Sequence, residues 1–204
     1  DLVFDGLASP ALGLWPEGHV NYNPALEDIV TYDPALAEEL LGGASVDLDI
    51  AIIAAVPGHD TIAQVIQSQL GEVGINVNII PTQDRVAEFI TPELPGALIV
   101  PGSRTGVDKY DRVFTQGQSQ ALCGVGRPDV IDPLAPASAL PPGDASAAEL
   151  FQAADLIIAE HAYLVPIVFQ PNLVVYNSET LGGDALFTSS QSQPMIDTFY
   201  VRAG

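Results

Sequence analysis

The chain has 204 residues, and 26 Asp and Glu against 6 Lys and Arg give a formal net charge of −20. This charge argues against nucleic acid or an anionic membrane surface as a partner, because their phosphate groups would be repelled. Hydrophobic residues make up 48% of the chain, so we expect a real core and a single domain spanning residues 1–204.

The chain begins without Met, in the middle of the pattern Asp-Leu-Val-Phe, so we expect it to be part of a longer polypeptide. It contains no apolar run of the ~20 residues that a membrane span needs, and no N-terminal signal pattern. Cys123 is the single cysteine, which excludes an internal disulfide and says little about the compartment.

The first predicted helix follows residues 1–32, a segment rich in glycine, proline and asparagine. Asp33 is a typical N-cap residue, and Pro34 suits the first position of a helix. The glycine pair that begins at Gly42 should end this short helix. Three leucines are expected on its inner face: Leu36, Leu40 and Leu41.

Residues 46–80 are expected to form a strand, a helix and a second strand. Over residues 46–56, apolar residues first alternate with polar ones and then run on without interruption, as in a strand that becomes buried. Over residues 60–73, apolar residues recur at helical spacing, and Gly74 favours a left-handed C-cap. The alternation returns over residues 75–80. A helix that crosses between two strands predicts a parallel pair.

The second half of the chain mixes apolar segments with irregular ones. We expect a helix from Thr82 and a short buried strand over residues 96–100. Residues 103–145 are the least regular part and carry four of the six basic residues. Segments of this length without regular structure are usually functional or disordered. A capping box that begins at Ser146 predicts a helix over residues 146–161.

The predicted fold class is α/β. We expect a mixed sheet in which the strands over residues 46–56 and 75–80 run parallel. The two long helices, over residues 60–73 and 146–161, are expected to pack on this sheet. A last strand is predicted within residues 195–201 because apolar and polar residues alternate there.

The residue types that enzymes use for catalysis form no recognisable pattern in this sequence. The histidines His19, His59 and His161 lie far apart, and no H-E-x-x-H motif or cysteine pair indicates a metal site. Residues 102–106 do not form a G-x-S-x-G nucleophile elbow, because Pro101 occupies its first position. We therefore expect no cofactor, no metal and no catalysis. A small α/β hydrolase stays open as the alternative, and it would need a nucleophile beside a base.

Four stretches carry a resemblance to a known family. Residues 32–41 read Y-D-P-A-L-A-E-E-L-L, and the unit over residues 46–80 contains I-x-x-x-L-x-x-x-G-I. Residues 124–132 read G-V-G-R-P-D-V-I-D, and residues 159–173 read A-E-H-A-Y-L-V-P-I-V-F-Q-P-N-L. In this order and spacing they resemble the extracytoplasmic solute-binding proteins of family 5, the peptide- and nickel-type receptors of ABC importers.

The resemblance implies lobe II of a periplasmic-binding-protein-like type II fold, in which two lobes close on a ligand around a hinge. The chain would be the C-terminal ligand-binding lobe of a larger receptor, with the first lobe elsewhere in the same polypeptide. The implied function is the capture of a peptide or similar small solute for an ABC permease in the membrane. The implied location is extracytoplasmic, as a cell-surface lipoprotein or in the periplasm. A domain that only docks on the permease is a third possibility.

Candidate site residues follow from the expected sheet. In open α/β sheets, ligands bind beyond the carboxyl ends of parallel strands. In this chain, those ends are expected at residues 57–59 and 101–104. Asp108 is the candidate for a ligand ammonium group, and Arg104 for a carboxylate. Tyr110 would stack on the ligand or hydrogen-bond to it. The candidate ligand-binding residues are Ser103, Arg104, Asp108 and Tyr110.

Two departures from the family pattern leave the ligand class open. Residues 100–102 read V-P-G and lack the tryptophan of the family's G-W pair. Residues 108–114 read D-K-Y-D-R-V-F and lack the proline of the family's D-P-x-x-F pattern, whose aspartate can hold a peptide amino group.

Overall fold

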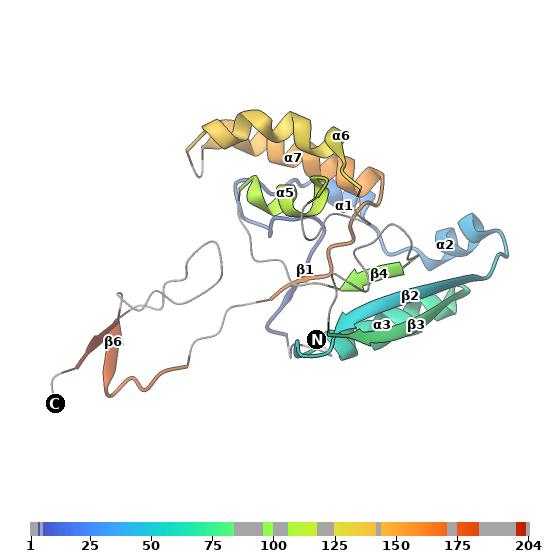
Figure 1. The fold of residues 1–204 in the computed structure, drawn as a ribbon, viewed down its shortest axis with the longest axis horizontal. Coiled ribbons are helices and arrows are strands. Elements are labelled where there is room, and N and C mark those ends of the chain that lie inside the picture. Colours follow the sequence, from blue (N-terminus) through green and yellow to red (C-terminus); the bar gives the residue numbers. More distant parts are fainter. Residues whose placement is uncertain are drawn as a thin grey trace.

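The computed structural model describes most of the chain (Figure 1). The described residues are 4, 6–83, 96–99, 106–117, 125–141, 144–170, 175–183 and 199–202. Their buried apolar side chains form two separate clusters. One cluster lies between a parallel sheet and a helix, and the other lies among the remaining helices.

The parallel sheet consists of β2 (Val46–Ile53), β3 (Ile75–Thr82) and β4 (Gly96–Ile99), in the order β3-β2-β4. β2 pairs parallel with both of its neighbours. Helix α3 (His59–Glu72) connects β2 to β3. The β-α-β unit and the α/β fold class predicted from the sequence are therefore confirmed. The antiparallel pairs of the described chain lie in separate two-stranded sheets.

One face of this sheet forms the smaller hydrophobic core. Ile50 and Ile52 of β2 are buried against Ile62 and Ala63 of α3. Removing this apolar surface from water is the main contribution that holds helix and sheet together. The alternation of apolar residues in the sequence identified this face correctly.

The other face of β2 and β3 carries paired polar side chains. Asp47 lies opposite Asn76 and Asp49 opposite Asn78 in the parallel register. In each pair, the asparagine Nδ2 donates a hydrogen bond to the aspartate Oδ1 at 3.0 Å. Cross-strand pairs of this kind stabilise the register of a sheet, because a shift by one residue would break them.

Glycines with positive φ stand at both ends of α3. Gly58, with a φ of 86°, precedes the first helical residue, and Gly74, with a φ of 91°, follows the C-cap residue. Glycine adopts this left-handed conformation at little cost, whereas other residues are strained there. The predicted helix and its C-terminal signal are thus confirmed.

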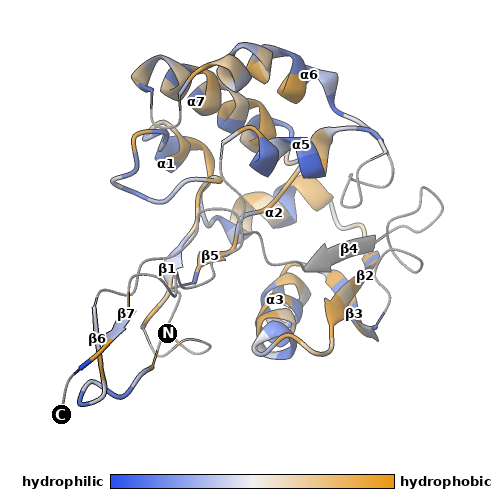
Figure 2. Cartoon of the chain, turned by 60° about the vertical axis from the view of Figure 1, so that its left-hand side comes forward, coloured by the Kyte–Doolittle hydropathy of each residue, from blue (hydrophilic) through white to orange (hydrophobic). Residues whose placement is uncertain are grey.

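The larger core lies among helices that gather away from the sheet (Figures 1 and 2). The elements of this group are α1 (Leu26–Ile29), α5 (Asp108–Phe114), α6 (Pro128–Ile131), the 3-10 helix η2 (Asp132–Ala139) and α7 (Ala145–Glu160). Tyr110, Phe114, Val130 and Leu134 are among its most deeply buried residues. Trp15, from the segment after β1, packs into the same core.

The position of α7 differs from the prediction that this helix packs on the sheet. Phe151, Ala154 and Ile158 of α7 belong to the helical core, and the core of the sheet contains no residue of α7. The prediction was wrong because an amphipathic pattern shows that one face of a helix is buried but not which element covers it.

Helix α2 (Pro34–Leu41) begins as predicted, but the apolar face predicted for it is not buried. The Oδ1 atom of Asp33 accepts a hydrogen bond from the backbone N–H of Leu36 at 2.9 Å, which caps the helix. Leu36 is nevertheless 47% exposed and Leu40 78% exposed. The predicted inner face is therefore a solvent-facing surface of the described chain.

Two small antiparallel pairs complete the fold. β1 (Ser9–Pro10) pairs with β5 (Val168–Phe169), and β6 (Leu181–Gly183) pairs with β7 (Phe199–Val201). The β6–β7 pair lies apart from both cores in the two views (Figures 1 and 2). Among the described residues, no helix combines the length and the apolar character needed to span a bilayer.

Candidate functional site

The carboxyl ends of β2, β3 and β4 meet at one edge of the sheet, because the three strands run parallel. His59, which begins α3 directly after β2, is only 4% exposed at this edge. Burial lowers the pKa of its imidazole, although the nearby Asp60 acts in the opposite direction. The Nδ1 atom has no hydrogen-bond partner in the described part of the chain.

The four candidate ligand-binding residues have different surroundings. Ser103 and Arg104 lie outside the described residues. Asp108 is exposed at the start of α5. Tyr110, two residues further along that helix, is fully buried with 0% of its surface exposed. A direct ligand contact therefore stays a prediction for Ser103, Arg104 and Asp108, whereas the buried Tyr110 would act through its neighbours.

The hydroxyl group of Tyr110 lies at the centre of a buried polar network. It accepts a hydrogen bond from Trp15 Nε1 at 2.7 Å and donates one to Asp155 Oδ1 at 2.7 Å. The other carboxylate oxygen of Asp155 accepts a hydrogen bond from the backbone N–H of Leu14 at 2.9 Å. Three segments that are distant in sequence are thus joined through one carboxylate.

Burial sets the protonation of this network. Asp155 is only 2% exposed, and desolvation raises the pKa of its carboxyl group, against the opposing effects of its hydrogen bonds and of Lys109. Burial beside Asp155 also raises the pKa of the Tyr110 hydroxyl well above its usual range. Tyr110 is therefore a neutral donor at physiological pH.

Lys109 adds a cation to the network. Its ammonium group donates to the carbonyl oxygen of Leu14 and lies 3.9 Å from the ring centroid of Trp15, a cation–π contact. Burial lowers the pKa of Lys109 to about 8, although Asp155 favours the charged form. His19 stacks on Trp15 with 4.5 Å between ring centroids, and desolvation together with Lys109 lowers the pKa of this histidine.

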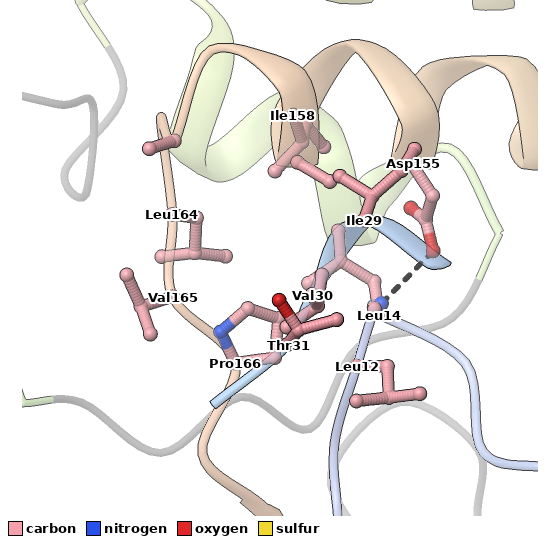
Figure 3. A pocket seen from close by; sticks show the side chains of 13 residues that line it. Leu12, Leu14, Ile29, Val30, Thr31, Asp155, Ile158, Leu164, Val165 and Pro166 are labelled. Carbon is pink, nitrogen blue, oxygen red and sulfur yellow. Dashed lines mark hydrogen bonds between the residues drawn. The ribbon is translucent and has the colours of Figure 1, made fainter. Parts of the chain in front are cut away.

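An open pocket of about 240 Å³ lies beside Asp155 (Figure 3). Residues 12–14, 29–31, 162 and 164–166 line it together with Asp155, Ile158 and Ala159 of α7. Figure 3 shows aliphatic side chains around the pocket and the carboxylate of Asp155 directed at the backbone of Leu14. Because its lining is mainly aliphatic, the pocket suits an aliphatic group better than an ion.

Asp155 was not among the residues predicted from the sequence, although the sequence contains a signal for it. Asp155 lies four residues after Phe151 and three before Ile158, on the buried face of α7. A carboxylate on the apolar face of a helix is uncommon unless it is paired. Trp15 and Lys109 gave no comparable signal, because neither lies in a long periodic element.

A metal site has no support among the described residues. Nowhere in these ranges do three or more His, Cys, Asp or Glu side chains come together in a way that could hold a metal ion.

Residues 1–117, more than half of the chain, match the family described as bacterial extracellular solute-binding proteins, family 5 Middle. Among curated proteins, none matches the chain significantly.

Solved structures with a similar fold include a dipeptide binding protein from Pseudoalteromonas sp. SM9913 in complex with Met-Leu, with a TM-score of 0.69 and 18% identity over 98% of this chain and 41% of that one. A nickel ABC transporter protein from Bacillus halodurans gives a TM-score of 0.69 and 15% identity over 98% of this chain and 45% of that one. The periplasmic binding protein DppA from Helicobacter pylori, in complex with the peptide STSA, gives a TM-score of 0.61 and 20% identity over 82% of this chain and 34% of that one.

The chain thus spans less than half the length of these structural relatives. Their fold agrees with the parallel β-α-β unit and the packed helices described above. By the match over residues 1–117, the chain belongs to the bacterial extracellular solute-binding proteins of family 5.

Proposed function

We propose that this chain is part of the substrate-binding receptor of an ABC importer and helps to capture a peptide or a similar small solute. The observation that carries the proposal is the family match over residues 1–117, a range that includes β2, β3, β4 and α5. The similar fold of a protein that binds Met-Leu and of one that binds the peptide STSA supports a peptide as the first ligand to test.

The chain would supply one wall of the binding cleft. We infer that residues 1–204 form the C-terminal ligand-binding lobe and that the first lobe belongs to the same polypeptide. The chain covers only 41% and 45% of two relatives of similar fold, which supports this division. The inferred location is extracytoplasmic, as a cell-surface lipoprotein or in the periplasm, and the inferred partner is a membrane permease.

Asp108 is our proposed contact for the ammonium group of a peptide ligand. It is an exposed carboxylate at the start of α5. A carboxylate attracts an ammonium group and accepts charge-assisted hydrogen bonds from it. We keep Arg104 as the proposed contact for a ligand carboxylate, since a guanidinium group binds carboxylates through two parallel hydrogen bonds. Ser103 stays a proposed ligand contact beside it.

We expect this protein to bind without catalysis. The family comprises solute-binding receptors rather than enzymes. The hydrolase alternative has no support from the family or from the similar structures. Purified receptor should therefore release an offered peptide unchanged.

The full-length receptor provides the test, by calorimetry with Met-Leu and with N-acetyl-Met-Leu, which lacks the ammonium group. If Asp108 holds that group, the wild-type receptor should prefer Met-Leu, and Asp108→Asn should weaken Met-Leu binding by about tenfold or more. N-acetyl-Met-Leu should bind both proteins equally. Asp28→Asn, which removes an exposed carboxylate from the first turn of α1, is the matched control and should change neither affinity.

Two results would contradict the proposal. A receptor that binds neither probe nor any other small peptide would argue against a peptide ligand. Equal affinity of the wild-type protein for both probes would remove the role of Asp108 while leaving the receptor function intact.

A further inference from the structure

The buried network around Asp155 lies beneath the helix that carries Asp108. Lys109 and Tyr110 directly follow Asp108 in α5, and both side chains are held by groups outside that helix. Tyr110 is bound to Asp155, and Lys109 is bound to the carbonyl oxygen of Leu14. The start of α5 is therefore attached to α7 and to the N-terminal segment at two consecutive residues.

A helix as short as α5 does not fix its own position. It has 7 residues, which is fewer than an isolated helix needs to be stable in water. Its apolar anchors, Tyr110 and Phe114, bury 99% or more of their surfaces but are non-directional. The hydrogen bonds of Tyr110 are directional, so they determine how far the helix is rotated and shifted within its apolar site.

Asp155 is the member of the network that all three segments share. It accepts hydrogen bonds from Tyr110 of α5 and from the N–H of Leu14, and it belongs to α7 itself. A buried carboxylate is costly unless it is well hydrogen-bonded, and a satisfied buried network favours one arrangement over its alternatives. Apolar side chains at these places would hold the segments together without selecting that arrangement.

We propose that Asp155 is a positioning residue for the ligand site, which through Tyr110 and the N–H of Leu14 sets where α5 presents Asp108. The proposal rests on the function proposed above, because it needs Asp108 to face the ligand. Asp155 itself touches no ligand in this scheme. Its effect on binding is indirect, and it is largest for ligands whose ammonium group Asp108 holds.

The first test measures the position of α5 without any ligand. Amide hydrogen exchange of the full-length receptor is compared for wild type, Asp155→Asn and Tyr110→Phe. Asparagine keeps the shape of aspartate but offers one acceptor oxygen in place of two, so one of the two hydrogen bonds is lost. The amides of α5 should exchange about tenfold faster or more in both variants, while those of α3 stay unchanged.

Leu134→Ala is the matched control. Leu134 is fully buried in the same helical core but takes no part in the polar network. Its truncation should destabilise the helical group generally, without a selective effect on α5. If Asp155→Asn changed exchange in the same uniform way as Leu134→Ala, the carboxylate would be an ordinary core residue and the proposal would be wrong.

The second test measures selectivity, which a loss of stability alone does not alter. The ratio of the affinities for Met-Leu and N-acetyl-Met-Leu is measured by calorimetry for each variant. Unfolding of part of the sample scales both affinities equally and leaves the ratio unchanged. Asp155→Asn and Tyr110→Phe should lower the ratio several-fold, and Leu134→Ala should leave it as in wild type.

A double variant shows whether Asp155 acts through Asp108. In the Asp108→Asn background the ratio is already lost, so adding Asp155→Asn should produce no further change. An unchanged ratio in Asp155→Asn and Tyr110→Phe, with a discriminating wild-type receptor, would overturn the positioning role. A wild-type receptor that does not discriminate between the probes would instead overturn the proposed role of Asp108, and the proposal for Asp155 with it.

Discussion

Gly13 allows the N-terminal segment to pass very close to α7. A Cβ atom added at this position would lie 2.6 Å from Asp155 Oδ2 and 2.6 Å from Leu26 Cδ1. Real side chains do not approach each other so closely, and the carboxylate could not move aside without losing its hydrogen bonds. Gly13→Ala should therefore lower the free energy of unfolding by about 1–3 kcal/mol, measured by denaturant titration.

Gly71→Ala is the control for this prediction. Gly71 lies in α3, where an added Cβ meets nothing within 4 Å. Alanine is the better helix former, so this variant should be more stable than wild type by up to about 1 kcal/mol. Equal effects of the two substitutions would mean that the close approach at Gly13 does not exist in solution.

His59 offers a second prediction, because its Nδ1 atom is buried without a partner in the described structure. Replacing an unsatisfied buried polar group by an apolar one of similar size is close to neutral or stabilising. His59→Leu should therefore be at least as stable as wild type at pH 7 in thermal or denaturant unfolding. A loss above about 2 kcal/mol would show that the imidazole has a binding partner in the folded protein.

The stability of the protein at acidic pH should also depend on His59. Burial lowers the pKa of His59 in the folded protein below 6.5, the ordinary pKa of histidine. As the pH falls through 6.5, the unfolded chain therefore binds more protons than the folded protein does. Stability should therefore fall as the pH is lowered from 7 through that value. The fall should be smaller in His59→Leu, although it should not vanish, since His19 also has a lowered pKa.

Helix caps show how far single residues could be interpreted from sequence. Asp33 was predicted as an N-cap, and its carboxylate does cap α2. Ser146 was predicted to begin the long helix, but Asp144 is the N-cap and accepts hydrogen bonds from both the N–H and the hydroxyl of Ser146. Both are short polar residues that suit an N-cap, so the sequence does not distinguish between them.

The paired Asp and Asn side chains of β2 and β3 allow a test of the strand register. Asn78→Asp would place a carboxylate directly opposite Asp49 and remove the hydrogen bond between them. We expect a loss of about 0.5–1 kcal/mol in denaturant unfolding, because like charges opposite each other destabilise a sheet. Added salt should reduce this loss by screening the repulsion.

Asn78→Thr separates the two effects of that substitution. It removes the amide group without adding a charge, so its loss of stability should not depend on salt. A salt-independent effect of Asn78→Asp would show that these two side chains do not face each other as the parallel register requires.

Elements with a local pattern were predicted well, and their packing partners were not. The β-α-β unit follows from periodicities within residues 46–80, and the structure confirms it. The placement of α7 among other helices and the exposure of Leu40 depend on distant parts of the chain. Periodicity identifies the apolar face of an element, but what covers that face is decided by tertiary packing.

The proposed division of the receptor into two lobes has a consequence for the isolated chain. We expect it to fold but to bind Met-Leu poorly, because a receptor that closes on its ligand divides the contacts between two lobes. If full-length receptor binds at about 1 μM and this chain retains half of the binding free energy, its affinity falls to about 1 mM. Calorimetry on both proteins tests this, and equal affinity would show that the site lies entirely within residues 1–204.

The candidate site could be predicted only in outline. The carboxyl edge of the parallel sheet followed from the predicted strands, whereas Asp108 as a ligand contact stays a prediction. The role of Asp155 could not be derived, because the residues that bind it come from positions 14 and 110. Sequence reasoning finds such a carboxylate as an anomaly on an apolar face, whereas its partners appear only in the folded structure.

Trp15 is the one tryptophan among the 204 residues, and it lies at the junction of the N-terminal segment and α5. The ammonium group of Lys109 lies 3.9 Å from its ring centroid, and its Nε1–H is bound to Tyr110. The emission of an indole ring depends on the groups around it, and those around Trp15 include Lys109, the hydroxyl of Tyr110 and the stacked ring of His19. The molecule carries its own optical probe, and a titration through pH 8 would follow the charge of Lys109 without any label.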